Sequence, residues 1–167
     1  MNSELISEQI LTDEIYLNSD DINHDINGLI NIKLKEKLEG KCINIGFIIN
    51  NSISIINRSK YGKCVGDNKI KYIVNYKTNV VSPVIGSIIT CHVKNITKAG
   101  VVAYIKLSDY GDYDTNIFTE SPLVILIPLN RFDDKSINSG DKIDIEITAM
   151  RIKYKNQTIQ IIGRPIK

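Results

Sequence analysis

The chain has 167 residues, of which 43% are hydrophobic, and its net charge is only +2. This length suits one mid-sized domain or two small ones. No apolar run approaches the about 20 residues that cross a bilayer, and the acidic, polar start predicts no secretory signal. Cys42, Cys64 and Cys91 are odd in number and lack CxxC spacing, so we expect reduced thiols in an intracellular protein, without disulfides or a zinc site.

The charge is unevenly distributed along the chain. Residues 41–106 carry 10 basic side chains and 1 acidic one, and residues 151–167 carry 5 basic side chains and none that is acidic. Residues 1–40 and 107–150 each carry 3 basic and 9 acidic side chains. Such asymmetry indicates a polyanion or a charged protein partner on the basic surface, and the alternative is that the charges only solvate the surface.

A strand and then an amphipathic helix are predicted at the start. The stretch "QILTDEIYL" predicts a strand from Ile10 to Leu17, and "NSDD" predicts a turn or a helix cap. Apolar residues then recur near a 3.6-residue period, at Ile22, Ile26, Leu29, Ile30, Leu34 and Leu38. Asp20 and Asp21 occupy positions typical of helix N-caps, and Gly40 is expected to end the helix.

Three strands are expected to follow this helix. The segments "CINIGFIIN" and "SISIIN" are apolar and rich in β-branched residues, and "RSKYGKCVGDNK" is expected to be a basic loop with a turn at "GDN". The segment "IKYIVNYKTNVV" alternates, which places on one face Ile70, Tyr72, Val74 and Tyr76. Strands around one helix predict a small α+β domain over residues 1–83, with Pro83 and Gly86 marking its boundary.

Residues 84–167 are expected to form a second domain. Five strand candidates are "SIITCHVKNI", "GVVAYIKL", "LVILIPL", "DKIDIEITAMRIKY" and "TIQIIGRPI". The second and third are separated by the long polar stretch "SDYGDYDTNIFTESP", and "NRFDDKSINSGD" before the fourth resembles a short helical turn. This arrangement predicts a five-stranded OB-fold β-barrel. The spacing from Gly86 to Ile105 is similar to the opening of an RNA-binding OB domain of the ribosomal-protein type.

The order of these motifs resembles one protein family over nearly the whole chain. The motifs are the EGKC-x-x-x-GF signature from Glu39 to Phe47, the strand Tyr72–Tyr76, then Pro83, and finally Gly86–Val93. The chain resembles the stalk subunit of multisubunit RNA polymerases, which is the seventh subunit of RNA polymerase II or the larger archaeal stalk subunit. The resemblance implies a truncated ribonucleoprotein-like tip domain followed by an OB domain. A polymerase of a large DNA virus or of a protist would fit the divergent, AT-rich sequence.

The resemblance also implies a function, partners and a location. The chain would be a non-catalytic subunit of a DNA-directed RNA polymerase that docks on the largest and other core subunits, near the clamp and the RNA exit path. Its OB domain would guide nascent single-stranded RNA, and a smaller stalk subunit would be a further partner. It would need no cofactor, because the metal ions of catalysis are held by other subunits. It would have no membrane partner. Its place would be the nucleus, or the host cytoplasm, viral factory and virion for a viral protein.

Two groups of residues are expected to make these contacts. The loop from Asn57 to Asp67 would project from the tip sheet and dock on the polymerase, together with the turn after the first strand. The docking residues would be Asn18, Ser19, Asp20, Arg58, Lys60, Tyr61, Lys63, Val65 and Gly66. Basic side chains suit phosphates, and aromatic side chains suit stacked nucleobases. The RNA-binding residues would be Lys94, Lys98, Tyr104, Lys106, Tyr110, Arg131, Arg151, Lys153, Tyr154 and Lys155.

Other readings of these residues remain open. The hairpin "RIKYKNQ" could be an ordinary solvated turn, and Phe118 or a tyrosine could simply pack the barrel. The family often has an aromatic residue after the OB-domain glycine, where this chain has Val101 and Val102. A purely structural adaptor that binds no RNA therefore stays open, as does a free-standing single-stranded-RNA-binding OB protein that mimics a translation factor.

No catalytic or metal site is predicted. His24 and His92 are far apart and lack companion ligands, and the pair Asp133 and Asp134 lies in a turn-like composition. The glycines near Gly62 lack the Lys-Ser/Thr and the helix of a phosphate-binding loop.

Overall fold

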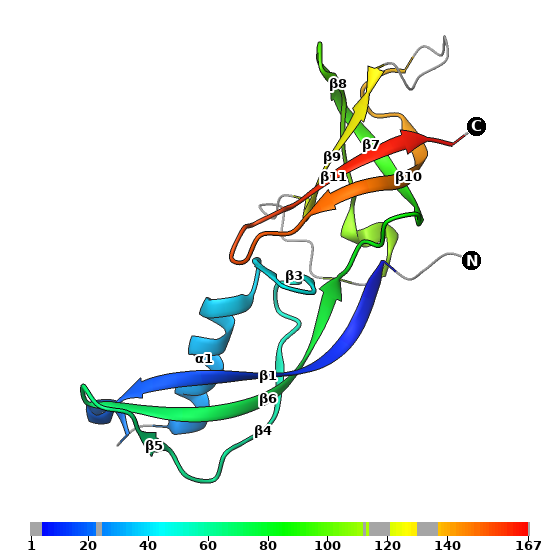
Figure 1. Cartoon of the computed structure of the whole chain (residues 1–167). Coiled ribbons are helices and arrows are strands. Elements are labelled where there is room, and N and C mark those ends of the chain that lie inside the picture. Colours follow the sequence, from blue (N-terminus) through cyan, green and yellow to red (C-terminus); the bar gives the residue numbers. More distant parts are fainter. Residues whose placement is uncertain (1–4, 23–24, 112, 114–120, 130–136, 167) are drawn as a thin grey trace.

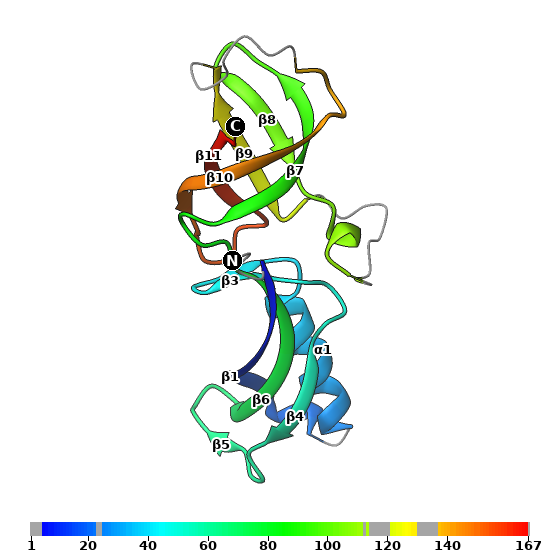
Figure 2. The same ribbon diagram turned by 90° about the vertical axis from the view of Figure 1, so that its right-hand side faces the viewer.

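The structure is a computed structural model that describes residues 5–22, 25–111, 113, 121–129 and 137–166. The described chain is mostly β and contains two units with separate sheets (Figures 1 and 2). The first is a six-stranded sheet with one helix against it, and the second is a closed five-stranded barrel.

The first unit is organised around one long strand. Its elements are β1 (Ile6–Asn18), α1 (Ile26–Leu38), β2 (Cys42–Ile43), β3 (Gly46–Ile48), β4 (Ser54–Arg58), β5 (Lys63–Cys64) and β6 (Lys69–Val81). Strand β6 pairs with β1 along one edge over the 13 residues of each strand. Along its other edge it pairs in turn with β3, β4 and β5, so this single strand holds the sheet together.

The core of this unit follows the periodicities of the sequence. The alternation in β6 turns Tyr72, Val74 and Tyr76 to one face, where all three are buried. Helix α1 places Ile30 and Leu34 against this face, and both are fully buried. The strand alternation and the helical period therefore predicted the same core from its two sides.

Several boundaries differ from the predicted ones. The helix begins at Ile26 and not at Ile22, and Asp20 and Asp21 lie in a short 3₁₀ turn at Ser19–Asp21 instead of at the helix N-cap. The expected strand "CINIGFIIN" is divided into β2 and β3, which pair with each other. Gly46 makes this division possible, because its φ is +153° and a Cβ there would collide with the carbonyl oxygen of Val81.

The expected basic loop contains a short strand and a tight turn. Strand β5 pairs with β6 inside the segment expected to be loop. The turn between them is the predicted "GDN" turn, where Asp67 and Asn68 have φ values of +48° and +57°. Aspartate and asparagine tolerate this left-handed region better than most residues, so the local sequence fixes the turn.

The barrel has the connectivity of an OB-like fold. Its strands are β7 (Ile88–Ile96), β8 (Gly100–Tyr104), β9 (Leu123–Pro128), β10 (Lys142–Arg151) and β11 (Ile159–Pro165). They close in the order β7–β8–β9–β11–β10, and β10 returns to β7. Only β9 and β11 are parallel, and the other neighbours are antiparallel. The five predicted strands are present, whereas most of the short helical turn expected between β9 and β10 lies outside the described residues.

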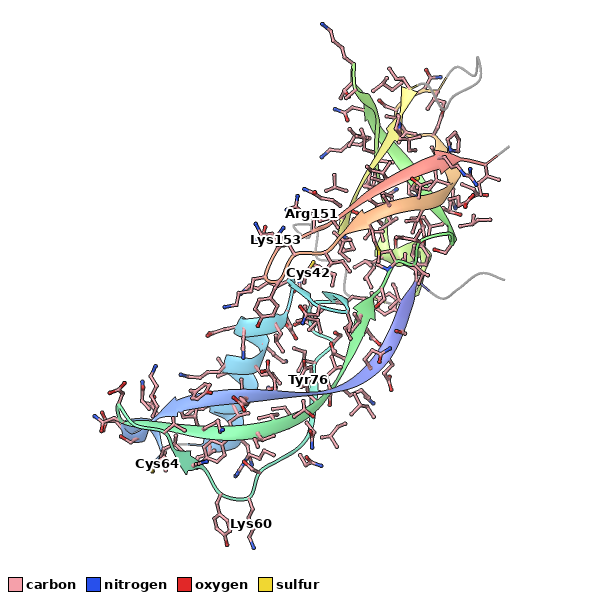
Figure 3. All side chains as sticks on the ribbon, viewed as in Figure 1. Cys42, Lys60, Cys64, Tyr76, Arg151 and Lys153 are labelled. Atoms are coloured by element: carbon pink, nitrogen blue, oxygen red, sulfur yellow. The ribbon has the colours of Figure 1, made fainter. Side chains whose placement is uncertain are left out.

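The two units share a buried junction. One cluster of buried side chains runs from Phe47, Ile49 and Val81 of the first unit into the barrel core. The β10–β11 turn reaches back to the first unit, where the N–H of Cys42 donates to the Asn156 carbonyl at 2.7 Å and the N–H of Lys155 donates to the Cys42 carbonyl at 2.8 Å. Figure 3 shows Cys42 beside this turn. The junction thus has both apolar and hydrogen-bonded contacts.

Candidate functional site

The outer surface of β8 and β9 is the first candidate site. In OB barrels the face of the second and third strands, together with the first and last turns, binds oligonucleotides. Here the side chains of Lys94 and Tyr104 lie on that face and line a shallow hollow of about 220 Å³. The hollow is completed by Val102, Ala103, Ser121, Leu123, Val124 and Thr158. The structure thus brings together two of the predicted RNA-binding residues.

Tyr104 is held in place by a histidine that was not predicted to be functional. The rings of His92 and Tyr104 are stacked with centroids 5.6 Å apart and planes 30° apart. His92 Nε2 lies 2.7 Å from Asp109 Oδ2, and this hydrogen bond lowers the pKa of the Asp109 carboxyl. His92 pairs with Tyr104 across β7 and β8, which brings the two rings together. The register of this hairpin could therefore have predicted the contact between His92 and Tyr104.

A second hollow continues this surface across β9, β11 and β10. It has a volume of about 370 Å³ and is lined by Val124, Leu126, Ala149, Met150, Arg151, Gln160, Ile161 and Ile162. Val124 is 43% exposed and Ile162 is 44% exposed, although both are aliphatic. Arg151, a predicted RNA-binding residue, lines this hollow. The unbroken apolar run "LVILIPL" could have predicted this surface. In a strand with one solvated face, polar residues normally alternate with apolar ones, and this run has none.

The other predicted RNA-binding residues are dispersed. Lys98 is exposed in the β7–β8 turn, and Lys106 is exposed after β8. In the β10–β11 turn Lys153 is exposed, and Lys155 Nζ lies 5.7 Å from the ring centroid of the half-exposed Tyr154. Because the backbone of this turn binds Cys42, these three side chains lie at the junction between the two units.

Tyr110 packs against the barrel core instead of standing on its outer face. Its hydroxyl donates to the Thr90 carbonyl at 3.1 Å, and burial raises the pKa of its phenol. Arg131 and Phe118 lie outside the described residues. The structure therefore does not bring Tyr110 together with Tyr104 as a second stacking surface.

The predicted docking residues lie at the end of the first unit that is far from the barrel. Figure 3 shows Lys60 at this end, where Tyr61 is 76% exposed and Lys60 Nζ lies 5.4 Å from its ring centroid. The neighbouring residues Lys63, Val65 and Gly66 are also exposed. The turn with Asn18, Ser19 and Asp20 lies at the same end, since the Ser19 N–H donates to the Asn68 carbonyl at 2.7 Å.

Arg58 differs from the other docking candidates. Its Nε donates to Asn27 Oδ1 at 2.7 Å, and its guanidinium lies 5.3 Å from the ring centroid of Tyr72. The side chain is therefore turned toward α1 and not outward with Lys60.

Among the residues that the structure describes, no group of three or more histidine, cysteine, aspartate or glutamate side chains is placed to hold a metal ion. None of their helices has the length and apolar character needed to span a membrane.

The chain matches no protein-family model, and it matches no curated protein sequence. A functional assignment must therefore come from the fold, the surfaces and the order of the sequence motifs.

Proposed function

We propose that this chain is a non-catalytic stalk subunit of a DNA-directed RNA polymerase. The first unit would be the truncated ribonucleoprotein-like tip that docks on the largest and other core subunits, near the clamp and the RNA exit path. The barrel would guide nascent RNA, and a smaller stalk subunit would be a second partner.

One observation supports this proposal above the others. The exposed pair Lys60 and Tyr61 lies at one end of the molecule, and the barrel face with Lys94 and Tyr104 belongs to the unit at the other end (Figures 1 and 3). A continuous buried junction joins the two units. One end could thus bind a large partner while the other reaches a nucleic acid that leaves it, which is what a stalk requires.

The barrel face would bind RNA through charge and stacking. Lys94 and Arg151 would contact phosphates without reading the sequence, so the affinity would fall as salt rises. Tyr104 would stack on a nucleobase, and the aliphatic surface around Val124 would accept a neighbouring base.

A free-standing single-stranded-RNA-binding protein is the second candidate function. It is favoured by the same barrel face, because Lys94 and Tyr104 would bind RNA without a polymerase. This candidate gives no role to the exposed basic end of the first unit.

The deciding experiment is a pull-down from the native source with the tagged chain. The test variant is Lys60→Glu with Lys63→Glu. The control variant is Lys77→Glu with Lys142→Glu, which makes the same charge change at exposed lysines away from the docking end. We expect the wild-type chain and the control to retain the large polymerase subunits and the test variant to lose them.

The other outcomes separate the alternatives. If the wild-type chain retains no polymerase subunit, the stalk assignment fails and the free RNA-binding protein becomes the leading account. If the test variant retains polymerase as well as the control does, the assignment stands but the docking surface is elsewhere.

A further inference from the structure

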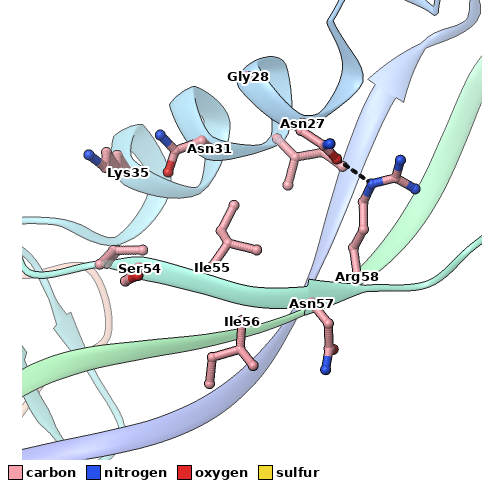
Figure 4. A pocket seen from close by; sticks show the side chains of 11 residues that line it. Asn27, Gly28, Asn31, Lys35, Ser54, Ile55, Ile56, Asn57 and Arg58 are labelled. Atoms are coloured by element: carbon pink, nitrogen blue, oxygen red, sulfur yellow. Dashed lines mark hydrogen bonds between the residues drawn. The ribbon is translucent and has the colours of Figure 1, made fainter.

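A groove between α1 and β4 lies beside the proposed docking loop, and only Asn57 and Arg58 at its end belong to that loop. It has a volume of about 670 Å³ and runs along one side of the helix (Figure 4). Its lining includes Asn27, Asn31 and Lys35 on the helix side and Ile53, Ile55 and Arg58 on the strand side. Helix and strand thus contribute its two walls.

The strand wall has a free edge. Among the described residues β4 pairs only with β6, which leaves the N–H and C=O groups of its other edge without a strand partner. Such an edge is a template for one more strand. Proteins often block edges with lysine or proline, but "SIIN" in β4 carries neither, and the first charged side chain is Arg58.

The helix wall leaves room beside this edge. Asn27, Asn31 and Lys35 recur every four residues and so lie on one side of α1. Gly28 adds no side chain to this side. The side chains of Asn31 and Lys35 make no hydrogen bond to any residue that the structure describes. The hydroxyl of Ser54, across the groove, makes none to these residues either. These polar groups are available to an incoming ligand.

The chemistry of the groove selects among ligands. Two of its lining residues, Lys35 and Arg58, are basic and none is acidic, while Ile53 and Ile55 give it an apolar floor. Arg58 closes one end through its hydrogen bond to Asn27, which Figure 4 shows as a dashed line. The lining contains no aromatic side chain on which a nucleobase could stack, so a peptide fits this surface better than RNA.

We propose that this groove binds an extended segment of a partner protein, in which acidic residues alternate with small apolar ones, as an added strand on β4. Main-chain hydrogen bonds to the free edge would supply affinity. Alternate side chains would point to opposite faces, so the acidic set would turn toward α1, near Lys35 and Arg58, while the small apolar set would lie on the opposite face beside Ile56. Strand β4 has five residues, so the paired part of the peptide would be about 17 Å long.

The test uses the full chain and a synthetic probe. The probe is a fluorescein-labelled 12-residue peptide of alternating glutamate and valine, and its affinity is measured by fluorescence anisotropy. We expect Lys35→Glu to weaken binding about fivefold or more, whereas Lys142→Glu, with the same charge change on the barrel, should leave it unchanged. A peptide with a central proline should bind more weakly, because proline cannot donate to a strand ladder.

A second measurement locates the peptide. Amide hydrogen exchange should slow at Ile55, Ile56 or Asn57 when the probe is present, because the free edge of β4 becomes paired. Equal binding by Lys35→Glu and Lys142→Glu, equal binding of the proline peptide, or protection confined to other strands would overturn the proposal. So would displacement of the probe by a single-stranded oligouridylate at equal concentration. Lys35 is not a docking residue, so this result is independent of the polymerase pull-down.

Discussion

At the scale of single residues, the RNA binding proposed for the barrel would depend most on the side chain of Tyr104. Its ring is already stacked on His92, so little conformational entropy would be lost when a base is added to the stack. The stalk family that the sequence resembles often has an aromatic residue after the OB-domain glycine, whereas here Val101 is buried and Val102 lines the hollow beside Tyr104.

Replacing Tyr104 tests this role directly. Stacking of one base on an aromatic ring contributes about 1–3 kcal/mol, so Tyr104→Ala should lower the affinity for single-stranded RNA by about 5-fold to 150-fold. The measurement is a filter-binding titration at fixed, moderate salt. Tyr16→Ala is the control, because Tyr16 is 43% exposed but lies on β1 of the first unit. Unchanged affinity of Tyr104→Ala would exclude stacking at this position.

The three cysteines should differ sharply in reactivity. Cys42 and Cys91 are buried, and burial raises the pKa of both thiols, to about 12 for Cys91. The thiolate is the reactive form, so at pH 8 these two groups are both neutral and shielded. Cys64 is exposed at the end of the molecule far from the barrel.

We therefore expect one thiol to react rapidly with Ellman's reagent at pH 8 and two more to react only after unfolding in guanidinium chloride. Cys64→Ser should abolish the rapid reaction and leave the other two unaffected. Rapid reaction of two or three thiols in the native chain would show that Cys42 or Cys91 is accessible. As pH rises above the ordinary thiol value of 9.0, the folded state should lose stability, because a folded Cys91 keeps its proton up to about pH 12.

At the scale of elements, the strongest periodicities were the ones that predicted structure. The alternation in β6 and the 3.6-residue spacing in α1 each mark a face that packs into the core, although Ile26, Leu29 and Ile70 near the element starts are only partly buried. Element ends are set by individual turns and caps. The N-cap of α1 is Asp25, whose side chain makes no capping hydrogen bond. Asp20 and Asp21, which the sequence suggested as N-cap residues, therefore predicted the wrong helix start.

The candidate surfaces were less predictable than the strands, because they depend on which strands become neighbours. Tyr104 and Arg151 were chosen from composition, but the hollows that they line are closed by Val124 and Ile162, which come from other strands. The β10–β11 turn shows the same limit. Its basic sequence suggested a solvated or RNA-binding turn, while its backbone binds Cys42, which lies far earlier in the chain.

At the scale of the whole molecule, the junction decides whether the chain behaves as one body. The stalk function proposed above would require the chain to transmit its position on one partner to the other, which two freely hinged domains could not do. Here the buried cluster crosses the junction, and Cys42 is hydrogen-bonded to both Lys155 and Asn156. Interfaces of this apolar kind reduce relative domain motion.

Phe47 offers a way to measure this coupling. It lies on β3 of the first unit, is 6% exposed and belongs to the cluster that continues into the barrel. Truncating a buried phenylalanine to alanine costs about 3–5 kcal/mol, and a shared junction should spread that loss over both units. Phe47→Ala should therefore speed native-state hydrogen exchange in α1 and in β9 together, under conditions where exchange reports opening free energies. The control is Ile45→Ala, at a neighbouring residue that is 43% exposed. It should change the opening free energies of α1 and β9 by less than about 0.5 kcal/mol. Faster exchange in α1 with no change in β9 would mean that the barrel is stable by itself and that the junction does not couple the two ends.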